Sequence, residues 1–301
     1  MSVTAHQGPL VAFGKSSYGD SNPQRGSSLF DQGVGLMDPR RPYVPGSSPL
    51  AKAYGFYGVT QIPVLDAVPV ATGAAVLAAA AVQTAGTPMT LVSSSGSGIT
   101  VGASVRNLNT GVLATGLLAI DGSASATAMG QDGTINLYNP ATLVARNVTI
   151  TSSADDTGAT FTVAGYDIYG APLVETITGV NAGTAVGKKA FKYVASITPA
   201  GTLAAGPATV SAGIGSVFGL PLRADTLGDV YIFWNNAVQS NGTFVAADAT
   251  TATATTGDVR GTYVFSGGTL GTSRVQMFIT PKPANIAAGA TGLFGVTQYG
   301  G

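Results

Sequence analysis

The stretch ARNVTITSSADDTGATFTVAGYDIYGAPLVETITG, residues 145–179, decides the fold class. Apolar and polar side chains alternate in its NVTIT and TFTVAGYDI runs, which is the two-residue period of a half-buried antiparallel strand. The Val, Ile, Thr, Phe and Tyr residues at these positions fit the pleated surface of a sheet. We therefore predict consecutive strands here, and we interpret Asp155 and Asp156 between them as part of a hairpin turn.

The same pattern continues along the chain from about residue 59. Turn-forming pairs punctuate it at roughly ten-residue spacing and suit the positive φ of tight turns: Thr110-Gly111, Asp121-Gly122, Asp132-Gly133 and Thr157-Gly158. Strands are predicted over residues 64–70, 89–93, 99–107, 112–120, 134–140, 145–153, 159–170, 173–180, 190–200, 216–224, 229–238, 242–247, 258–265 and 274–283. Short strands with such turns predict an all-β fold, an antiparallel β-sandwich or jelly-roll-like body. Residues 74–82, AAVLAAAAV, fit either a helix or a strand, because alanine favours helices but no polar face is present.

Residues 1–58 have a different composition, with six prolines among many Gly and Ser residues. Proline fixes φ and removes a hydrogen-bond donor, so a long helix or paired strand does not fit here. Large apolar side chains nevertheless recur along the segment: Phe13, Tyr18, Leu29, Phe30, Met37, Tyr43, Tyr54, Phe56 and Tyr57. We expect an extended N-terminal arm whose aromatic residues occupy pockets on a neighbouring subunit; wrapping around its own domain is the alternative.

Three regions are thus predicted: the arm at 1–58, a β-rich region at 59–140 and a β-sandwich body at 141–301. The most apolar stretch, 64–82, is interrupted by Asp66, Pro69 and Gly73, so we do not expect it to span a membrane. The first residues, MSVTAHQG, lack the basic and apolar regions of a secretory signal.

The chain is poor in charge. Charged residues make up 9 % of it, against about 25 % in an ordinary soluble domain, and 14 acids balance 14 bases. Zero net charge argues against a nucleic-acid partner, which requires clustered basic residues. The densest basic cluster, Lys188, Lys189 and Lys192, is interpreted as a solvated strand end. Because surface charge keeps monomers apart, this composition favours a subunit whose surface is largely covered.

Residues that perform chemistry are scarce. The chain has no Cys, one His at His6 and one Glu at Glu175, and it lacks phosphate-loop and calcium-loop motifs. We therefore expect no catalytic, cofactor-binding or metal-binding residues, and a protein that is not an enzyme. Trp234 lies in the most apolar predicted strand, where core packing is the default and a carbohydrate-stacking surface the alternative.

Residues 145–179, together with FKYVASITPAG at 191–201, resemble virion structural proteins of tailed bacteriophages. So do TGDVRGTYVF at 256–265 and the arm sequence NPQRGSSLFDQGVGLMDPR at 22–40. In kind, the chain is most similar to a capsid decoration (cement) protein.

This resemblance implies a β-sandwich or jelly-roll body, often trimeric, on the outside of a capsid. The implied partners are the major capsid protein and copies of the chain itself, with no nucleic acid and no membrane. No individual residue roles are carried over, because this class has no site motif to match. A tail or head-fibre component of a virion and a carbohydrate-binding adhesin remain alternatives.

Overall fold

The computed structural model describes residues 62–96, 98–120, 144–239, 242–266, 268–280 and 292–301. Apart from Ile62 and Thr280, these residues belong to one compact unit. The predicted arm with its nine interface residues, and the strand predicted over 134–140, lie outside the described residues.

The described part of the chain is all-β, as predicted. It contains fifteen strands and one short 3-10 helix, Leu227–Asp229. Every strand pairing with a described register is antiparallel. Within these residues there is no helix of the length and apolarity that crossing a membrane requires.

One sheet has five strands in the order β3-β4-β9-β6-β7. Their bounds are β3 Ile99–Arg106, β4 Leu113–Ile120, β9 Tyr193–Gly201, β6 Ala159–Tyr166 and β7 Pro172–Thr178. In β6 the side chains alternate strictly between buried, such as Phe161 and Val163, and half-buried, such as Thr160 and Thr162. The two-residue period read from the sequence is therefore confirmed for this strand.

A second sheet has six strands, β13-β14-β10-β5-β8 with β2 paired to β10. Their bounds are β13 Thr243–Val245, β14 Thr262–Val264, β10 Val210–Gly219, β5 Arg146–Asp155, β8 Asn181–Phe191 and β2 Gly73–Ala81. One side of β10 pairs with β5, and the other pairs first with β2 and then with β14. The alanine-rich stretch 74–82, ambiguous in the sequence, thus belongs mainly to a strand.

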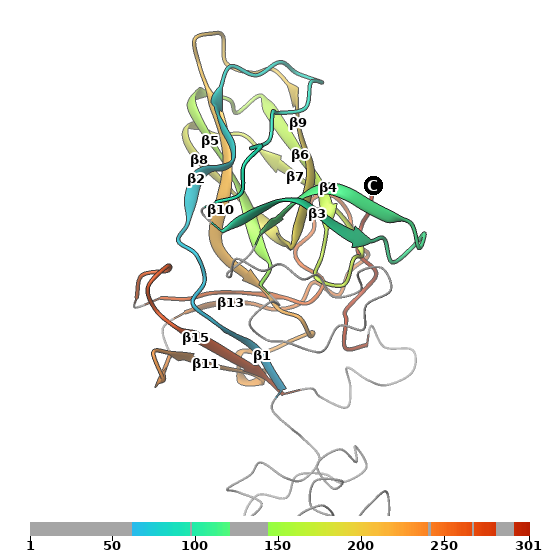
Figure 1. Ribbon diagram of the computed structural model, residues 1–301, viewed down its shortest axis with the longest axis vertical. Helices are drawn as coiled ribbons and strands as arrows, with labels where there is room; N and C mark the ends of the chain where they lie inside the picture. The colour runs from blue at the N-terminus through green and yellow to red at the C-terminus, as the bar shows by residue number, and fades with distance from the viewer. Residues whose placement is uncertain (1–61, 97, 121–143, 240–241, 267, 281–291) are drawn as a thin grey trace, which may run out of the picture. The chain divides into compact units, whose positions relative to one another are not determined.

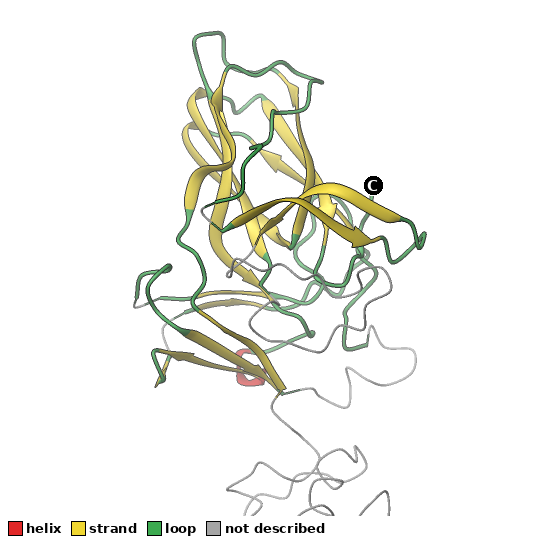
Figure 2. Cartoon of the chain, viewed as in Figure 1, coloured by secondary structure: helices red, strands yellow, loops and turns green. Residues whose placement is uncertain are grey.

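These two sheets, whose strands are drawn in Figures 1 and 2, share one apolar core. Val148, Ile150 and Ile214 of the six-stranded sheet belong to the same buried cluster as Phe161 and Ile197 of the five-stranded sheet. The chain crosses between the sheets from β5 to β6, from β7 to β8, from β8 to β9 and from β9 to β10.

The interpretation of Asp155 and Asp156 as part of a hairpin turn is therefore wrong. A turn does follow them at Thr157 and Gly158, but β5 and β6 pair in different sheets. Each strand directs one face toward the shared core. The chain therefore passes from one sheet to the other, and β5 and β6 do not pair with each other.

The strand predicted over 89–93 does not form. The amide of Met89 donates to the carbonyl of Ile197 in β9 at 2.8 Å, whereas the amide of Val92 donates to Leu77 in β2 at 3.0 Å. The segment therefore bridges the two sheets and extends neither ladder.

Strands from both sides of residue 141 share sheets. From the region before it, β2 pairs with β10 and β4 pairs with β9. The predicted β-rich region and β-sandwich body consequently contribute to a common core.

A third sheet has four strands in the order β1-β15-β11-β12. Their bounds are β1 Ile62–Ala67, β15 Val275–Ile279, β11 Val230–Trp234 and β12 Ala237–Val238. The single strand predicted over 229–238 is instead a hairpin, because Asn235 and Asn236 adopt positive φ angles of 48° and 66°. Two consecutive residues of positive φ form the two-residue turn that joins twisted antiparallel strands.

Candidate binding site

A cavity of about 480 Å³ opens between segments that are distant in sequence. Its lining comes from the β3–β4 connection, the β6–β7 turn, Arg260 and the C-terminal segment: Leu108, Asn109, Asp167, Tyr169, Ala171, Arg260, Phe294, Gly295, Val296, Thr297 and Gln298. This volume lies within the range of about 300–1,000 Å³ that is typical of ligand sites.

The β3–β4 connection forms one wall. The carboxamide oxygen of Asn107 accepts from the amides of Asn109 and Thr110, at 2.9 and 3.2 Å, and so fixes the turn. The amide of Leu108 donates to the carbonyl of Gly170 at 2.8 Å and holds this turn against the β6–β7 connection. Gly170 has a φ of 83°, and a β-carbon there would lie 2.3 Å from the carbonyl oxygen of Arg106, so this contact requires glycine.

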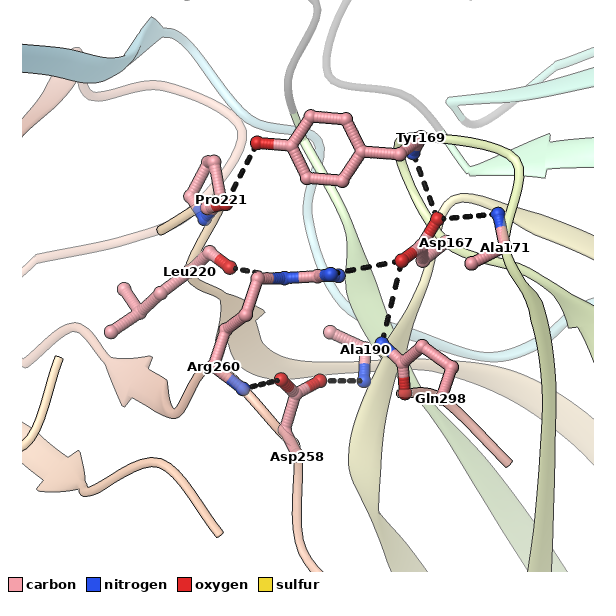
Figure 3. A network of polar contacts seen from close by, with 9 residues as sticks. All are labelled: Asp167, Tyr169, Ala171, Ala190, Leu220, Pro221, Asp258, Arg260 and Gln298. Atoms are coloured by element: carbon pink, nitrogen blue, oxygen red, sulfur yellow. Dashed lines mark hydrogen bonds and ion pairs between the residues drawn. The ribbon is translucent and has the colours of Figure 1, made fainter. Parts of the chain in front are cut away.

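Asp167 organises the turn between β6 and β7 (Figure 3). Its Oδ1 accepts from the amides of Tyr169 and Ala171, at 2.8 and 2.9 Å. Its Oδ2 accepts from Nη1 of Arg260 at 2.9 Å and from Nε2 of Gln298 at 3.4 Å. A single buried carboxylate thus joins the turn, the loop that precedes β14 and the C-terminal segment.

Arg260 is buried and has several partners (Figure 3). Its Nε donates to the carbonyl of Leu220 at 2.9 Å, and its guanidinium lies 5.3 Å from the centre of the Tyr169 ring. Burial by itself lowers the pKa of Arg260, but the carboxylates of Asp167 and Asp258 outweigh it, so the pKa is raised and the guanidinium stays charged.

Two neighbouring acids respond to burial. Asp258 accepts from the amides of Arg260 and Ala190, at 2.9 and 3.1 Å, and burial raises its pKa although Arg260 opposes the change. Burial also raises the pKa of Tyr169 to about 12. The Tyr169 hydroxyl therefore remains a donor, to the carbonyl of Pro221 at 2.7 Å.

The C-terminal segment 292–301 completes the cavity and is held at both ends. The carbonyl of Leu293 accepts from the amide of Arg223, and that of Tyr299 accepts from the amide of Val174, each at 2.7 Å. Between these anchors, Phe294 meets the Tyr169 ring edge-on at 5.1 Å but keeps 54 % of its surface exposed. The Oε1 of buried Gln298 has no hydrogen-bond partner within the described residues.

This arrangement is suited to binding. The two charged residues in the lining, Asp167 and Arg260, neutralise each other in an ion pair with exposures of 1 % and 4 %. Among the residues the structure describes, no group of three acidic or histidine side chains is placed to hold a metal ion. The cavity therefore offers a mostly apolar lining without net charge.

A second buried polar cluster lies where β7 faces β8. Glu175 accepts from the amides of Lys188 and Lys189, at 2.5 and 3.3 Å, and burial raises its pKa to about 7. The Nζ of Lys189 donates to the carbonyls of Val174 and Thr253, at 3.1 and 2.6 Å, and lies 5.7 Å from the Tyr299 ring. This cluster connects β7, the outer strand of the five-stranded sheet, to β8 and to the loop at Thr253.

The interpretation of the lysine cluster as a solvated strand end is wrong for two of its members. Lys188 is exposed, but Lys189 and Lys192 are 0 % and 2 % exposed. Lys189 turns inward because β8 passes close to the loop carbonyl of Thr253, which accepts its ammonium group.

Other residues singled out in the sequence are structural. Trp234 is buried and packs 5.9 Å from Phe265, so it has no free ring face for a sugar. Asp156 is buried and its Oδ1 accepts from the amide of Ala204 at 2.7 Å. His6, like the arm, lies outside the described residues.

The residues of the cavity were not singled out in the sequence. Asp167 lies in GYDIYG and Arg260 in GDVRG, and both segments read simply as strands with turns. In a chain with 9 % charged residues, an acid inside an otherwise apolar strand was the available signal, because such a charge is stable only with a partner. The identity of that partner, 93 positions away, could not be read from the sequence.

Comparisons with protein-family models, with curated proteins and with solved structures found no match to this chain.

Proposed function

We propose that this protein is a non-enzymatic structural component of a bacteriophage virion that decorates and stabilises the capsid. In this proposal the arm, residues 1–58, clamps neighbouring subunits, and the β body forms the outer part. The observation that carries it is the arm sequence: six prolines and recurring large apolar residues, among them the nine predicted interface residues, precede β1 in a chain with little charge. A specific interface buries roughly 1,200–2,000 Å² of accessible surface, and an extended segment of this kind supplies such an area without an additional folded domain.

The body has features that suit this role. The outer edge of β7 is covered, since the amide of Val174 donates to Tyr299 and that of Thr176 donates to Ala254. Covered edges protect a charge-poor sheet protein from uncontrolled strand pairing when many copies gather on one surface. The neutral cavity is likewise a binding feature that involves no reaction.

The arm can be tested on particles stripped of this protein. We expect the full chain to co-sediment with such particles, and the chain lacking residues 1–50 to remain unbound while keeping the far-ultraviolet circular dichroism of a β protein. A full-length variant with Phe13, Tyr18, Leu29 and Phe30 changed to Ser leaves the body intact and should also lose binding. Stoichiometric binding of both variants would sink the proposal.

A tail or head-fibre position in the same kind of particle is the competing location. Gold-labelled antibody against the body distinguishes the two directly. Label over the whole capsid surface supports decoration, and label confined to the tail excludes it.

A further inference from the structure

The side of the sandwich between β7 and β8 is closed by two surface segments. Each of these strands is the last in the order of its own sheet, so neither has a further strand beside it within the described residues. Residues 248–257 and 299–301, together called the strap, lie along this side. No residue of the strap is buried. Segments that bury little of their surface open locally at a low cost in free energy.

Backbone hydrogen bonds attach the strap to β7 on both sides of Glu175. The carbonyl of Tyr299 accepts from the amide of Val174 at 2.7 Å, and the carbonyl of Ala254 accepts from the amide of Thr176 at 2.8 Å. Both parts of the strap are thus fixed to the same three-residue stretch of the sheet edge. When the strap opens, these two edge amides lose their acceptors and face solvent.

Lys189 of β8 connects the same parts from inside the sandwich. Its Nζ donates to the carbonyls of Val174 in β7 and Thr253 in the strap, at 3.1 and 2.6 Å. It also lies 5.7 Å from the centre of the Tyr299 ring. The carboxylate of Glu175, which is 3 % exposed, accepts from the Lys189 amide at 3.3 Å. The strap therefore covers a buried ammonium group and a buried carboxyl group.

The loop of the strap has its own internal support. Oδ2 of Asp248 accepts from the amide of Gly257 at 2.9 Å, and its Oδ1 accepts from the amide of Thr250 at 3.1 Å. Just beyond the loop, Asp258 is held to β8 because it accepts from the amide of Ala190 at 3.1 Å. The loop can therefore lift from β7 as a unit while the chain that follows it stays in place.

We propose that the strap opens as the pH rises, which hydrates Glu175 and exposes the edge of β7. With the strap closed, burial raises the pKa of Glu175 to about 7, and contact with water returns it toward the ordinary value of 4.5. The closed state binds the proton more tightly, so opening releases one proton between these two pH values. The opening equilibrium therefore shifts by up to about tenfold per pH unit in this range and levels off above it.

Other charged groups face this site from β8 and from the loop. Lys189 lowers the pKa of Glu175, whereas Asp258 raises it. Burial lowers the pKa of Lys189, and Glu175, Asp258 and Asp248 oppose that change. Hydrogen bonds from Thr250 hold the pKa of Asp248 below its usual value of 3.8, so Asp248 stays ionised above pH 5. A Glu175→Gln chain removes the proposed titration and keeps these neighbours.

Hydrogen–deuterium exchange of the full chain between pH 5 and pH 8 tests the proposal. After correction for the intrinsic pH dependence of exchange, we expect the protection of the Val174 and Thr176 amides to fall roughly tenfold to a hundredfold from pH 5 to pH 7 and then to level off. In Glu175→Gln the protection should stay at its pH 5 value throughout. Constant protection in the native chain, or an equal fall in Glu175→Gln, would overturn the proposal.

The same measurement shows whether the opening is local. Residues 148–151 of β5 pair with strands on both sides, β8 and β10, and so report the unfolding of the whole sandwich. We expect these residues to be protected at least about tenfold more strongly than Val174 and Thr176 at every pH, since local opening costs less than global unfolding. Equal protection of the two stretches at each pH would mean that the chain opens only as a whole and would also overturn the proposal.

Two neighbouring lysines provide a matched pair of variants. Lys189→Met removes the ammonium group that holds the strap, whereas Lys188→Met changes an exposed side chain of the same strand. At pH 5 we expect Lys189→Met to lower the protection of Val174 and Thr176 roughly tenfold, as the loss of one charged hydrogen bond predicts, and Lys188→Met to leave it unchanged. Equal effects would contradict the role of Lys189. If Lys189→Met does not fold, the pH series of the native and Glu175→Gln chains decides the proposal.

Discussion

Asp167 and Arg260 form a fully buried ion pair, 2.9 Å apart, between the β6–β7 turn and the loop that leads into β14. The carboxylate also accepts two amides of its own turn, and the guanidinium also binds the carbonyl of Leu220. The pair therefore connects the β6–β7 turn, Arg260 and Leu220, which are far apart in the sequence. Its main consequence is for the stability of the cavity.

Removal of the guanidinium should be strongly destabilising. In Arg260→Met the Asp167 carboxylate stays buried without its cation, and breaking such a pair costs about 3–5 kcal/mol. Urea unfolding followed by tryptophan fluorescence measures this loss. Arg223→Met is the matched control, because Arg223 pairs with Asp225 at 2.7 Å but both side chains are partly exposed, and such pairs contribute less than about 1 kcal/mol. Equal losses in the two variants would contradict the assigned role of Arg260.

Glu175 should make stability depend on pH. Burial raises its pKa in the folded chain to about 7, against 4.5 when it is exposed, although Lys189 opposes the shift. The folded state therefore binds the proton more tightly, so this contribution is complete below pH 4.5 and is lost as the pH rises through about 7. The urea midpoint of the native chain should fall between pH 5 and pH 8. In Glu175→Gln, which resembles the protonated acid, this fall should largely disappear; parallel pH profiles would argue against it.

The fold class could be predicted from the sequence because side-chain alternation is a local property. The period in β6 and the Val, Ile and Thr content of β5 reflect the burial that each strand has in the sandwich. Only the last two residues of β8, Ala190 and Phe191, fall within a predicted strand. The rest of its sequence, NAGTAVGKK, contains glycines and lysines that weaken the alternating pattern. Its pairing with β5 along 11 residues overrides this weak local preference.

The cavity could not be predicted because it depends on which segments meet. Asp167, Arg260 and Gln298 come together through sheet pairing and through the anchored C-terminal segment. Each is unremarkable in its own stretch of sequence. The buried state of Lys189 was missed for the same reason, since its carbonyl partner at Thr253 lies 64 positions away.

Gly165 should tolerate no side chain. A β-carbon there would lie 1.9 Å from the carbonyl oxygen of Tyr193, where β6 and β9 shift register. Because backbone blocks the site on a paired neighbour, Gly165→Ala should destabilise the chain by several kcal/mol or prevent folding. Thermal unfolding monitored by circular dichroism gives the comparison. Gly96→Ala serves as the control, since no atom lies within 4 Å of its added β-carbon; a similar loss there would indicate a general effect of alanine.

The two asparagines of the β11–β12 turn should respond differently to glycine. Both have positive φ, which glycine adopts without strain, so backbone conformation alone predicts that either change is neutral or slightly stabilising. The side chain of Asn235, however, accepts from the amide of Arg274 at 2.9 Å and donates to the hydroxyl of Ser273 at 3.3 Å. Asn236 makes one longer contact, accepting from Nη1 of Arg274 at 3.3 Å. We therefore expect Asn235→Gly to lower the free energy of unfolding, measured by urea denaturation, by about 1 kcal/mol for the lost hydrogen bonds, and Asn236→Gly to leave it nearly unchanged. The reverse order would mean that backbone strain, and not the link to Arg274, governs this turn.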